Sequence, residues 1–264
     1  MMRPFIIDAH LHVGTSGMYF APGCDVSHLL ELMDKLRIEY AVCSESKALL
    51  CGSQVGMQAS YDVFEQSNGR VFFQGVFDPR NPQDCLKALE EAAERPGFVG
   101  LKIHPSMHGT PAESPAYEAA WAFARKHRCA ILAHTWSVSD YNPVQAYSTP
   151  ERFENHIRKF PGVHFVLGHA GGKGGGRAEA IRLANQYENV YLDFAGDIYC
   201  YRFFETMLNS VPVERILYGS DYPMLDPRAN LSRVLLGDMD EETKLKILRE
   251  NAIQAYGLGD MIEC

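Results

Sequence analysis

The sequence predicts an α/β fold with one domain, residues 1–264, and within that class a (β/α)8 TIM barrel. Short apolar, β-branched runs recur eight times along the chain, about 30 residues apart, and segments with helical signals fill the intervals. Regular alternation of strand and helix implies a parallel sheet with right-handed crossovers. Eight such units in about 250 residues match the size of this barrel.

The eight predicted strands begin near Phe5, Glu39, Val71, Phe98, Cys129, Val163, Val190 and Arg215. Three of the intervening helices carry a start signal, an N-cap residue type followed by proline, at Asn81-Pro82, Ser114-Pro115 and Thr149-Pro150. The last helix is expected to end at Gly257. A doubly wound open sheet is the alternative, but no GxGxxG pattern follows the first strand, which disfavours a dinucleotide-binding fold.

Composition narrows the possible partners. The chain has a net charge of −8 and is 46% hydrophobic, so it can build a large core. It has no basic run of the kind that binds nucleic acid and no apolar stretch near the ~18 residues of a membrane span, and we expect no signal peptide. Its seven cysteines show no C-x-x-C spacing, as expected for reduced thiols in the cytoplasm. We expect a cytoplasmic protein that acts on a small molecule, with neither nucleic acid nor membrane as a partner. The sequence leaves the oligomeric state open between a monomer and a homo-oligomer.

Polar side chains that can bind a metal stand at the ends of the predicted strands. They are His10 and His12 after the first strand, Lys102 and His104 at the end of the fourth, His134 at the fifth, His169 at the sixth and Asp221 at the eighth. Residues two apart on an extended chain point to the same side, so the first two imidazoles converge. In a barrel all these groups emerge at one rim. A single histidine at a strand end is usually structural, but five of ten histidines at such places indicate a site.

At these residues the chain resembles the amidohydrolase superfamily, and within it the branch of aminocarboxymuconate-semialdehyde decarboxylase and related metal-dependent hydrolases. The motifs are Asp8-Ala9-His10-Leu11-His12, His134, Leu167-Gly168-His169-Ala170-Gly171-Gly172 and Tyr218-Gly219-Ser220-Asp221-Tyr222-Pro223. The resemblance implies that His10, His12, His134 and Asp221 bind one divalent metal, with zinc favoured. It also implies that His169 is catalytic, and Asp221 is expected to take a proton as well as to bind the metal.

Four further side chains are candidates for substrate binding: Lys102, His104, Trp136 and Arg177. Larger members of the superfamily often carboxylate a lysine on the fourth strand to bridge two metals, so a second metal at Lys102 remains an alternative to one that pairs with substrate. Arg177 follows a glycine-rich loop and is expected to hold an anionic group. Glu45, Asp78 and Asp193 also follow strands and are candidates for the pocket wall.

The motifs are specific for the superfamily but not for the reaction. We expect hydrolysis of a small amide, lactone or ester by a metal-activated water. Non-oxidative decarboxylation of a small aromatic or unsaturated acid is the alternative, and the greater length of the decarboxylases that we compare favours hydrolysis. A barrel that binds a ligand without turnover is a third reading, which the complete set of ligands disfavours.

Overall fold

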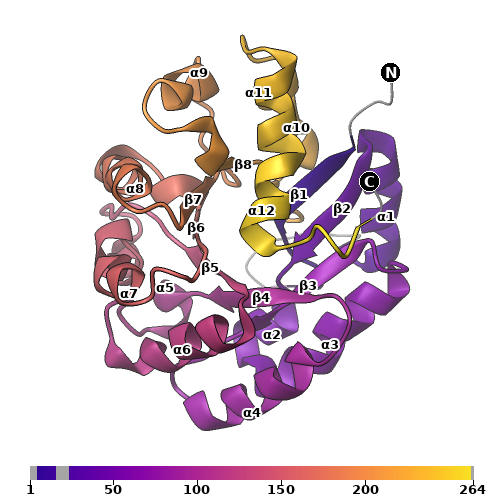
Figure 1. Ribbon diagram of the computed structural model, residues 1–264, viewed down its shortest axis with the longest axis vertical. Helices are drawn as coiled ribbons and strands as arrows, with labels where there is room; N and C mark the ends of the chain where they lie inside the picture. The colour runs from indigo at the N-terminus through magenta and orange to yellow at the C-terminus, as the bar shows by residue number, and fades with distance from the viewer. Residues whose placement is uncertain (1–4, 16–23, 263–264) are drawn as a thin grey trace.

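The computed structural model describes residues 5–15 and 24–262. Eight parallel strands are hydrogen-bonded in the order of the sequence, with helices around them, as in a (β/α)8 barrel (Figure 1). The strands are β1 Ile6–Leu11, β2 Ile38–Cys43, β3 Val71–Val76, β4 Phe98–Ile103, β5 Ala130–His134, β6 Phe165–Gly168, β7 Val190–Asp193 and β8 Ile216–Leu217. The predicted fold class and the order of the strands are therefore confirmed.

The helices that connect the strands are α1 Val26–Leu36, α2 Ser46–Cys51, α3 Ser53–Gln66, α4 Pro82–Ala93, α5 Pro105–His108, α6 Glu118–His127, α7 Glu154–Lys159, α8 Gly174–Gln186, α9 Phe203–Leu208, α10 Pro227–Leu235, α11 Glu241–Leu245 and α12 Asn251–Tyr256. Shorter turns of 3-10 helix are η1 Pro115–Tyr117, η2 Pro143–Tyr147, η3 Pro150–Phe153, η4 His169–Gly171 and η5 Val213–Arg215, and a π-helical stretch, η6 Lys246–Glu250, joins the last two helices. None of the described helices has the length and apolarity that crossing a bilayer requires.

The predicted helix starts are right in position but only partly right in mechanism. The Ser114 side chain accepts a hydrogen bond from the backbone of η1, as an N-cap residue does. Asn81 and Thr149 precede prolines at helix starts but make no such bond, and the Thr149 hydroxyl donates to Glu151 instead. Gly257 ends α12 with a φ of 66°, a left-handed conformation that glycine adopts without strain.

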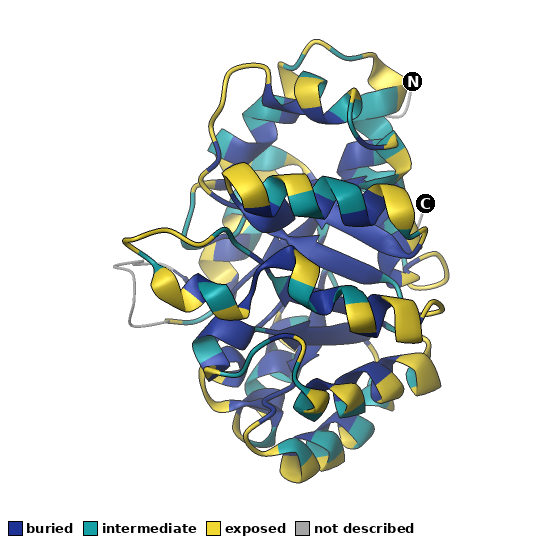
Figure 2. Cartoon of the chain, turned by 90° about the vertical axis from the view of Figure 1, so that its left-hand side faces the viewer, coloured by how far each residue is buried: buried dark blue, intermediate teal, exposed yellow. Residues whose placement is uncertain are grey.

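Most of the helices have a buried inner face and an exposed outer face, while the strands are almost wholly buried (Figure 2). One apolar cluster fills the space between strands and helices, and a second combines interior strand residues with residues of α12. The Tyr256 hydroxyl of α12 donates to the carbonyl of Ala9. His164, just before β6, contacts the carbonyl of Ala255, so α12 lies toward the amino-terminal ends of the strands. The carboxyl ends are thereby left open for a site.

The first and last strands close the barrel through the segment that follows β8. The backbone N–H of Ala9 donates to Tyr218 O at 2.9 Å, and the N–H of Asp221 donates to His10 O at 2.9 Å. The Asp8 carboxylate accepts from the backbone N–H groups of both His10 and Ser220. This closure places Asp221 directly beside the two histidines that end β1.

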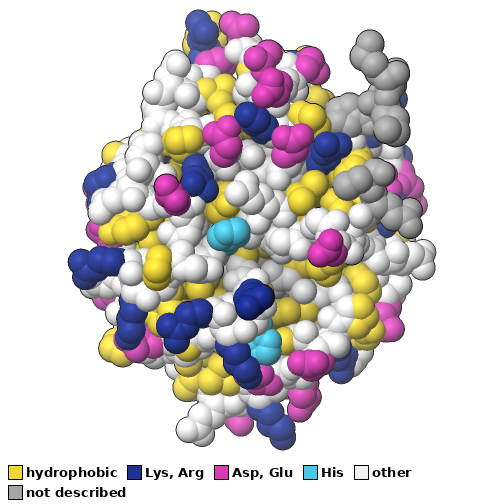
Figure 3. All heavy atoms as spheres, in the orientation of Figure 1, with side chains coloured by type: hydrophobic (Ala, Val, Ile, Leu, Met, Phe, Trp, Pro, Cys, Tyr) yellow, Lys and Arg dark blue, Asp and Glu magenta, His cyan; other side chains and the backbone are white. Residues whose placement is uncertain are grey.

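Acidic and basic side chains are interspersed on the face shown in Figure 3. The six cysteines that the structure describes are free thiols, as expected for a reduced protein. Cys264 lies outside the described residues.

Candidate metal centre

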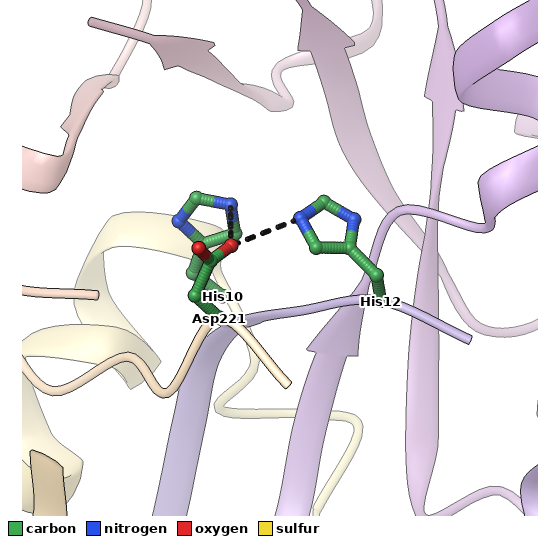
Figure 4. Close-up of side chains that lie close together, drawn as sticks. All are labelled: His10, His12 and Asp221. Carbon is green, nitrogen blue, oxygen red and sulfur yellow. Dashed lines mark ion pairs between the residues drawn. The ribbon is translucent and has the colours of Figure 1, made fainter. Parts of the chain in front are cut away.

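Three of the proposed metal ligands converge at the carboxyl end of the barrel (Figure 4). Asp221 Oδ1 lies 3.3 Å from His12 Nε2 and 3.9 Å from His10 Nε2. Both imidazoles are buried, and the carboxylate retains a small exposed fraction toward the cavity. The spacing of two along β1 brings the histidines together, and the closure of the barrel supplies the carboxylate.

The far side of each imidazole is already engaged, which fixes the nitrogen that remains for a metal. His12 Nδ1 lies 2.8 Å from the carbonyl oxygen of Ser44, so it must donate its proton there. His10 Nδ1 donates to Asp193 Oδ2 at 3.0 Å. His12 Nε2 is left with a lone pair that faces Asp221. His10 Nε2 accepts from Lys102 Nζ at 2.8 Å, a contact that a bound metal would replace. This is the arrangement in which metal-binding histidines are held, so the residues fit a divalent cation.

Asp193 therefore orients His10, although the sequence indicated it only as a possible pocket wall. Its Oδ1 accepts from the backbone N–H groups of His169 and Ala195, both at 3.0 Å, while Oδ2 accepts from His10. One fully buried carboxylate of β7 thus joins β1 to the ends of β6 and β7. Because all three of its partners are donors, an amide cannot replace it without turning an N–H toward another donor.

We expect Asp193→Asn to lower metal affinity by about 10- to 100-fold, the usual effect of losing such a partner. The amide forces His10 either to lose its bond or to move its proton to Nε2, which then cannot bind the metal. Competition titration with a chelator measures the affinity. Asp78→Asn is the matched control, since Asp78 is a buried acid that pairs with Arg80. Equal affinity in the wild-type protein and Asp193→Asn would refute the orienting role.

The surroundings favour the neutral forms of His10 and His134 and the charged form of Asp221. Burial lowers the pKa of His10 well below its usual value, and the Lys102 ammonium lowers it further. Burial and the neighbouring His169 do the same to the pKa of His134. Burial acts to raise the pKa of Asp221, but His169, His12 and His10 together outweigh it and lower that pKa. Neutral imidazoles and an ionised carboxylate are the protonation states that a metal requires.

His134, the fourth proposed ligand, is not among the described groups that converge on one point with Asp221. Its Nδ1 lies 3.1 Å from His169 Nε2, and its Nε2 lies 3.0 Å from Gln145 Oε1 of η2. His169 in turn donates from Nδ1 to the carbonyl of Ala195 at 2.8 Å. The two histidines form a connected pair beside the cluster, and both line the same cavity as Asp221.

Two of the proposed residues have left-handed backbone conformations. The φ angles are 62° at His169 and 61° at Asp221, directly after β6 and in the segment after β8. Such conformations are costly for residues other than glycine and recur at functional sites. In both places the chain turns sharply, which directs the side chain over the open end of the barrel.

A cavity of about 300 Å³ adjoins the cluster. Its polar lining includes His12, Lys102, His104, His134, His169 and Asp221, and its apolar lining is Leu49, Met107, Val144 and Met224. Lys102 is buried in the barrel with Nζ 2.8 Å from His10 Nε2, and burial lowers its pKa to about 8. The His104 ring stacks on His134 with centroids 4.0 Å apart.

Arg177 is not where the sequence predicted. It lies in the first turn of α8, where its guanidinium covers the Phe203 ring at 4.6 Å and donates to the carbonyl of Gly172. It lines neither this cavity nor the neighbouring one that Trp136 lines. The glycine-rich loop turns into α8 so early that the side chain points toward α9, and the structure does not bring Arg177 to the other proposed site residues.

The structure also brings in residues that the sequence did not single out. Gln145 and Asn142 line the cavity from the segment between β5 and η3, and Ser44 orients His12 through its carbonyl. No pattern marks Gln145 or Asn142, since Asn142 lies in irregular chain and Gln145 in a short turn of 3-10 helix. A backbone carbonyl such as that of Ser44 carries no signal in the sequence at all.

A barrel whose rim gathers two histidines two apart and an aspartate after the eighth strand defines a class of metal-dependent enzymes. The family model described as amidohydrolase matches residues 7–258, so the chain belongs to the amidohydrolase family. This confirms the resemblance that the motifs indicated. None of the curated proteins matches the chain by sequence.

Solved structures with the same fold include decarboxylases. A 2,6-dihydroxybenzoate decarboxylase in complex with 2,6-dihydroxybenzoate is 15% identical, with a TM-score of 0.77 over 97% of this chain and 100% of that chain. A dihydroxybenzoic acid decarboxylase from Polaromonas sp., with manganese and the inhibitor 2-nitroresorcinol, is 14% identical, with a TM-score of 0.75 over 99% and 100%. A TIM-barrel protein from Bordetella bronchiseptica is 18% identical, with a TM-score of 0.77 over 96% and 98%. At these identities the likeness shows the fold.

Proposed function

We propose that this protein is a metal-dependent decarboxylase that removes CO2, without oxidation, from a small aromatic or unsaturated carboxylic acid. The observation that carries the proposal is Lys102, a buried cation beside the proposed metal ligands and facing the cavity. A buried ammonium is costly unless it pairs with an anion, and a substrate carboxylate is such a partner. The decarboxylases of the same fold support this choice over the hydrolysis that the sequence favoured.

The rest of the cavity suits the body of such an acid. Leu49, Met107 and Val144 offer apolar contact, while the stacked rings of His104 and His134 offer a flat surface. A flat unsaturated body satisfies both kinds of contact and displaces water from the reacting group. Small-molecule sites commonly combine apolar walls with a few polar anchors in this way.

In the proposed reaction, the bond between the carboxylate and the substrate body breaks and its electron pair stays on the carbon of the body. CO2 leaves, and a proton that His169 or Asp221 takes from water replaces it on that carbon. Lys102 holds the acid in place. A divalent metal bound by His10, His12, His134 and Asp221 would supply positive charge that stabilises the negative charge developing on the substrate.

We infer one metal ion per protein, because Lys102 as an ammonium donates to His10 Nε2 and has no lone pair with which to bridge a second metal. Three imidazoles and one carboxylate suit zinc. Manganese is present in one decarboxylase of the same fold, so a divalent cation of either kind fits the proposal.

Hydrolysis is the second candidate, because the ionised Asp221 beside His169 is also suited to take a proton from water. The deciding experiment is a panel of small carboxylic acids, amides, lactones and esters given to the metal-loaded protein. Release of CO2 from the acids and hydrolysis of the amides, lactones and esters are measured separately. Release of CO2 from an acid supports the proposal, and turnover confined to lactones, amides or esters refutes it.

We expect Lys102→Met to raise the KM for the acid by about 10- to 100-fold, since a hydrogen bond to a charged group is lost. The unbranched side chain keeps the volume, so the metal content should stay near that of the wild-type protein. Lys126→Met is the control, because Lys126 is an exposed lysine that pairs with Glu90. An unchanged KM, or a loss of metal without a change in KM, would contradict the carboxylate-binding role.

A further inference from the structure

The cavity continues past the proposed catalytic groups into a second lobe, which we call the tryptophan lobe. It has a volume of about 370 Å³ beside the first lobe of about 300 Å³. Both lobes are lined by His134, Asn142, Gln145, His169, Asp221 and Met224. Because they share these groups, a molecule held at Lys102 can extend into the tryptophan lobe without leaving the site.

The lobe owes its name to Trp136, whose indole is held in place by close backbone contacts. A Cβ atom added at Gly172 would lie 2.7 Å from Trp136 Cδ2, and one at Gly196 would lie 3.5 Å from Cζ3. Both glycines have positive φ angles, +73° and +118°, so a side chain is strained at either position, and at Gly172 it would also collide with the indole. The indole also meets His169 edge to face, with ring centroids 5.5 Å apart. This wall is therefore formed before any ligand arrives.

Two opposite charges line the same lobe, Lys173 and Asp197. Lys173 Nζ and Asp197 Oδ2 are 4.0 Å apart, and each side chain is more than half exposed. That separation is too long for a hydrogen bond, so both groups remain able to bind a ligand. A neutral group that accepts from the lysine and donates to the aspartate satisfies both, whereas a carboxylate is repelled by Asp197 and a hydrocarbon satisfies neither.

We propose that the tryptophan lobe binds a second arm of the substrate, and that this arm lies along Trp136 and ends in a neutral hydroxyl or carboxamide group. The inference rests on the proposed decarboxylase function, in which the reacting carboxylate occupies the first lobe. It adds that the substrate is longer than a single unsubstituted ring, since such a ring leaves the second lobe empty.

The test is calorimetric titration of the metal-loaded protein with benzoic acid and with benzoic acids carrying a para arm. Arms of one, two and three carbon atoms end in a carboxamide, and alkyl arms of matching length are the comparison. We expect the best carboxamide to bind about tenfold more tightly than benzoic acid and than its alkyl counterpart. In the double variant Lys173→Met/Asp197→Asn the ratio between carboxamide and alkyl affinities should fall to near one.

A matched pair of glycine variants tests the wall. Gly172→Ala should displace Trp136 and remove the gain from the arm. Gly175→Ala should keep the gain, because a Cβ there meets nothing within 4 Å. A carboxamide that binds no better than benzoic acid at any length, or a gain that survives Gly172→Ala or the double variant, overturns the inference.

Release of CO2 from the same acids tests the reaction separately. Acids that show the arm preference but release no CO2 contradict decarboxylation and leave the tryptophan lobe as a binding site. Release of CO2 without any arm preference contradicts the lobe and supports the reaction.

Discussion

Asp221→Asn is expected to leave the protein folded while lowering turnover by about 10²- to 10⁴-fold, the range for a group that handles a proton. The carboxylate lies 3.3 Å from His12 Nε2 and 3.9 Å from His10 Nε2, so it completes the proposed metal cluster. An amide keeps the size of the side chain but removes the negative charge. Metal binding should weaken along with turnover, since the site then holds only neutral ligands.

Three measurements on this variant separate a functional role from a structural one: unfolding temperature, metal content and turnover. Asp226→Asn is the control, because Asp226 caps α10 by accepting from the backbone N–H of Arg228. The control should lose less than about 1 kcal/mol of stability and keep its turnover. Near-normal turnover in Asp221→Asn would refute the mechanism, because no other described carboxylate lies with His10 and His12 in one cluster.

His12→Ala is expected to release the metal. The wild-type protein should contain about one divalent ion per chain by elemental analysis, and the variant should lose it on dialysis. The reason is geometric: His12 Nδ1 is fixed on the Ser44 carbonyl, so its Nε2 is held toward Asp221 and loss of the ring leaves a gap that no neighbour fills. Activity should disappear with the metal.

His28→Ala is the matched control, because His28 is an exposed histidine that pairs with Asp25 on the surface. It should keep its metal and its turnover. Circular dichroism of both variants measures whether they are folded, and so distinguishes loss of a metal ligand from loss of the fold. Full metal content in a folded His12→Ala would remove His12 from the ligand set, and two ions per chain in the wild-type protein would revive the alternative of a bridging Lys102.

The order and approximate position of the strands were predictable because each strand is a short apolar run that local sequence marks. All eight predicted strands start within two residues of the observed ones. Helix starts were predictable from proline, whose fixed φ suits the first turn. The side chain that caps a helix was not, as Thr149 shows, because its hydroxyl had a competing partner in Glu151.

The candidate site was predictable where a periodicity of two and a strand end coincide, as at His10 and His12. The place of Arg177 was not, because the direction of a side chain at a helix start depends on how the preceding loop enters the helix. The position of Asp193 at the end of β7 was predictable from the sequence. Its role in orienting His10 was not, because its three hydrogen-bond donors come from separate parts of the chain.

The sequence by itself determined the class of fold, the family and the residues that gather at the rim, because these depend on local patterns repeated along the chain. Only the tertiary structure decided which atoms meet. It brought Asp221 beside His10 through closure of the barrel and placed His134 next to His169. It also packed Trp136 against Gly172 and Gly196. Each of these contacts joins residues far apart in sequence, and their distances follow from packing that no local pattern encodes.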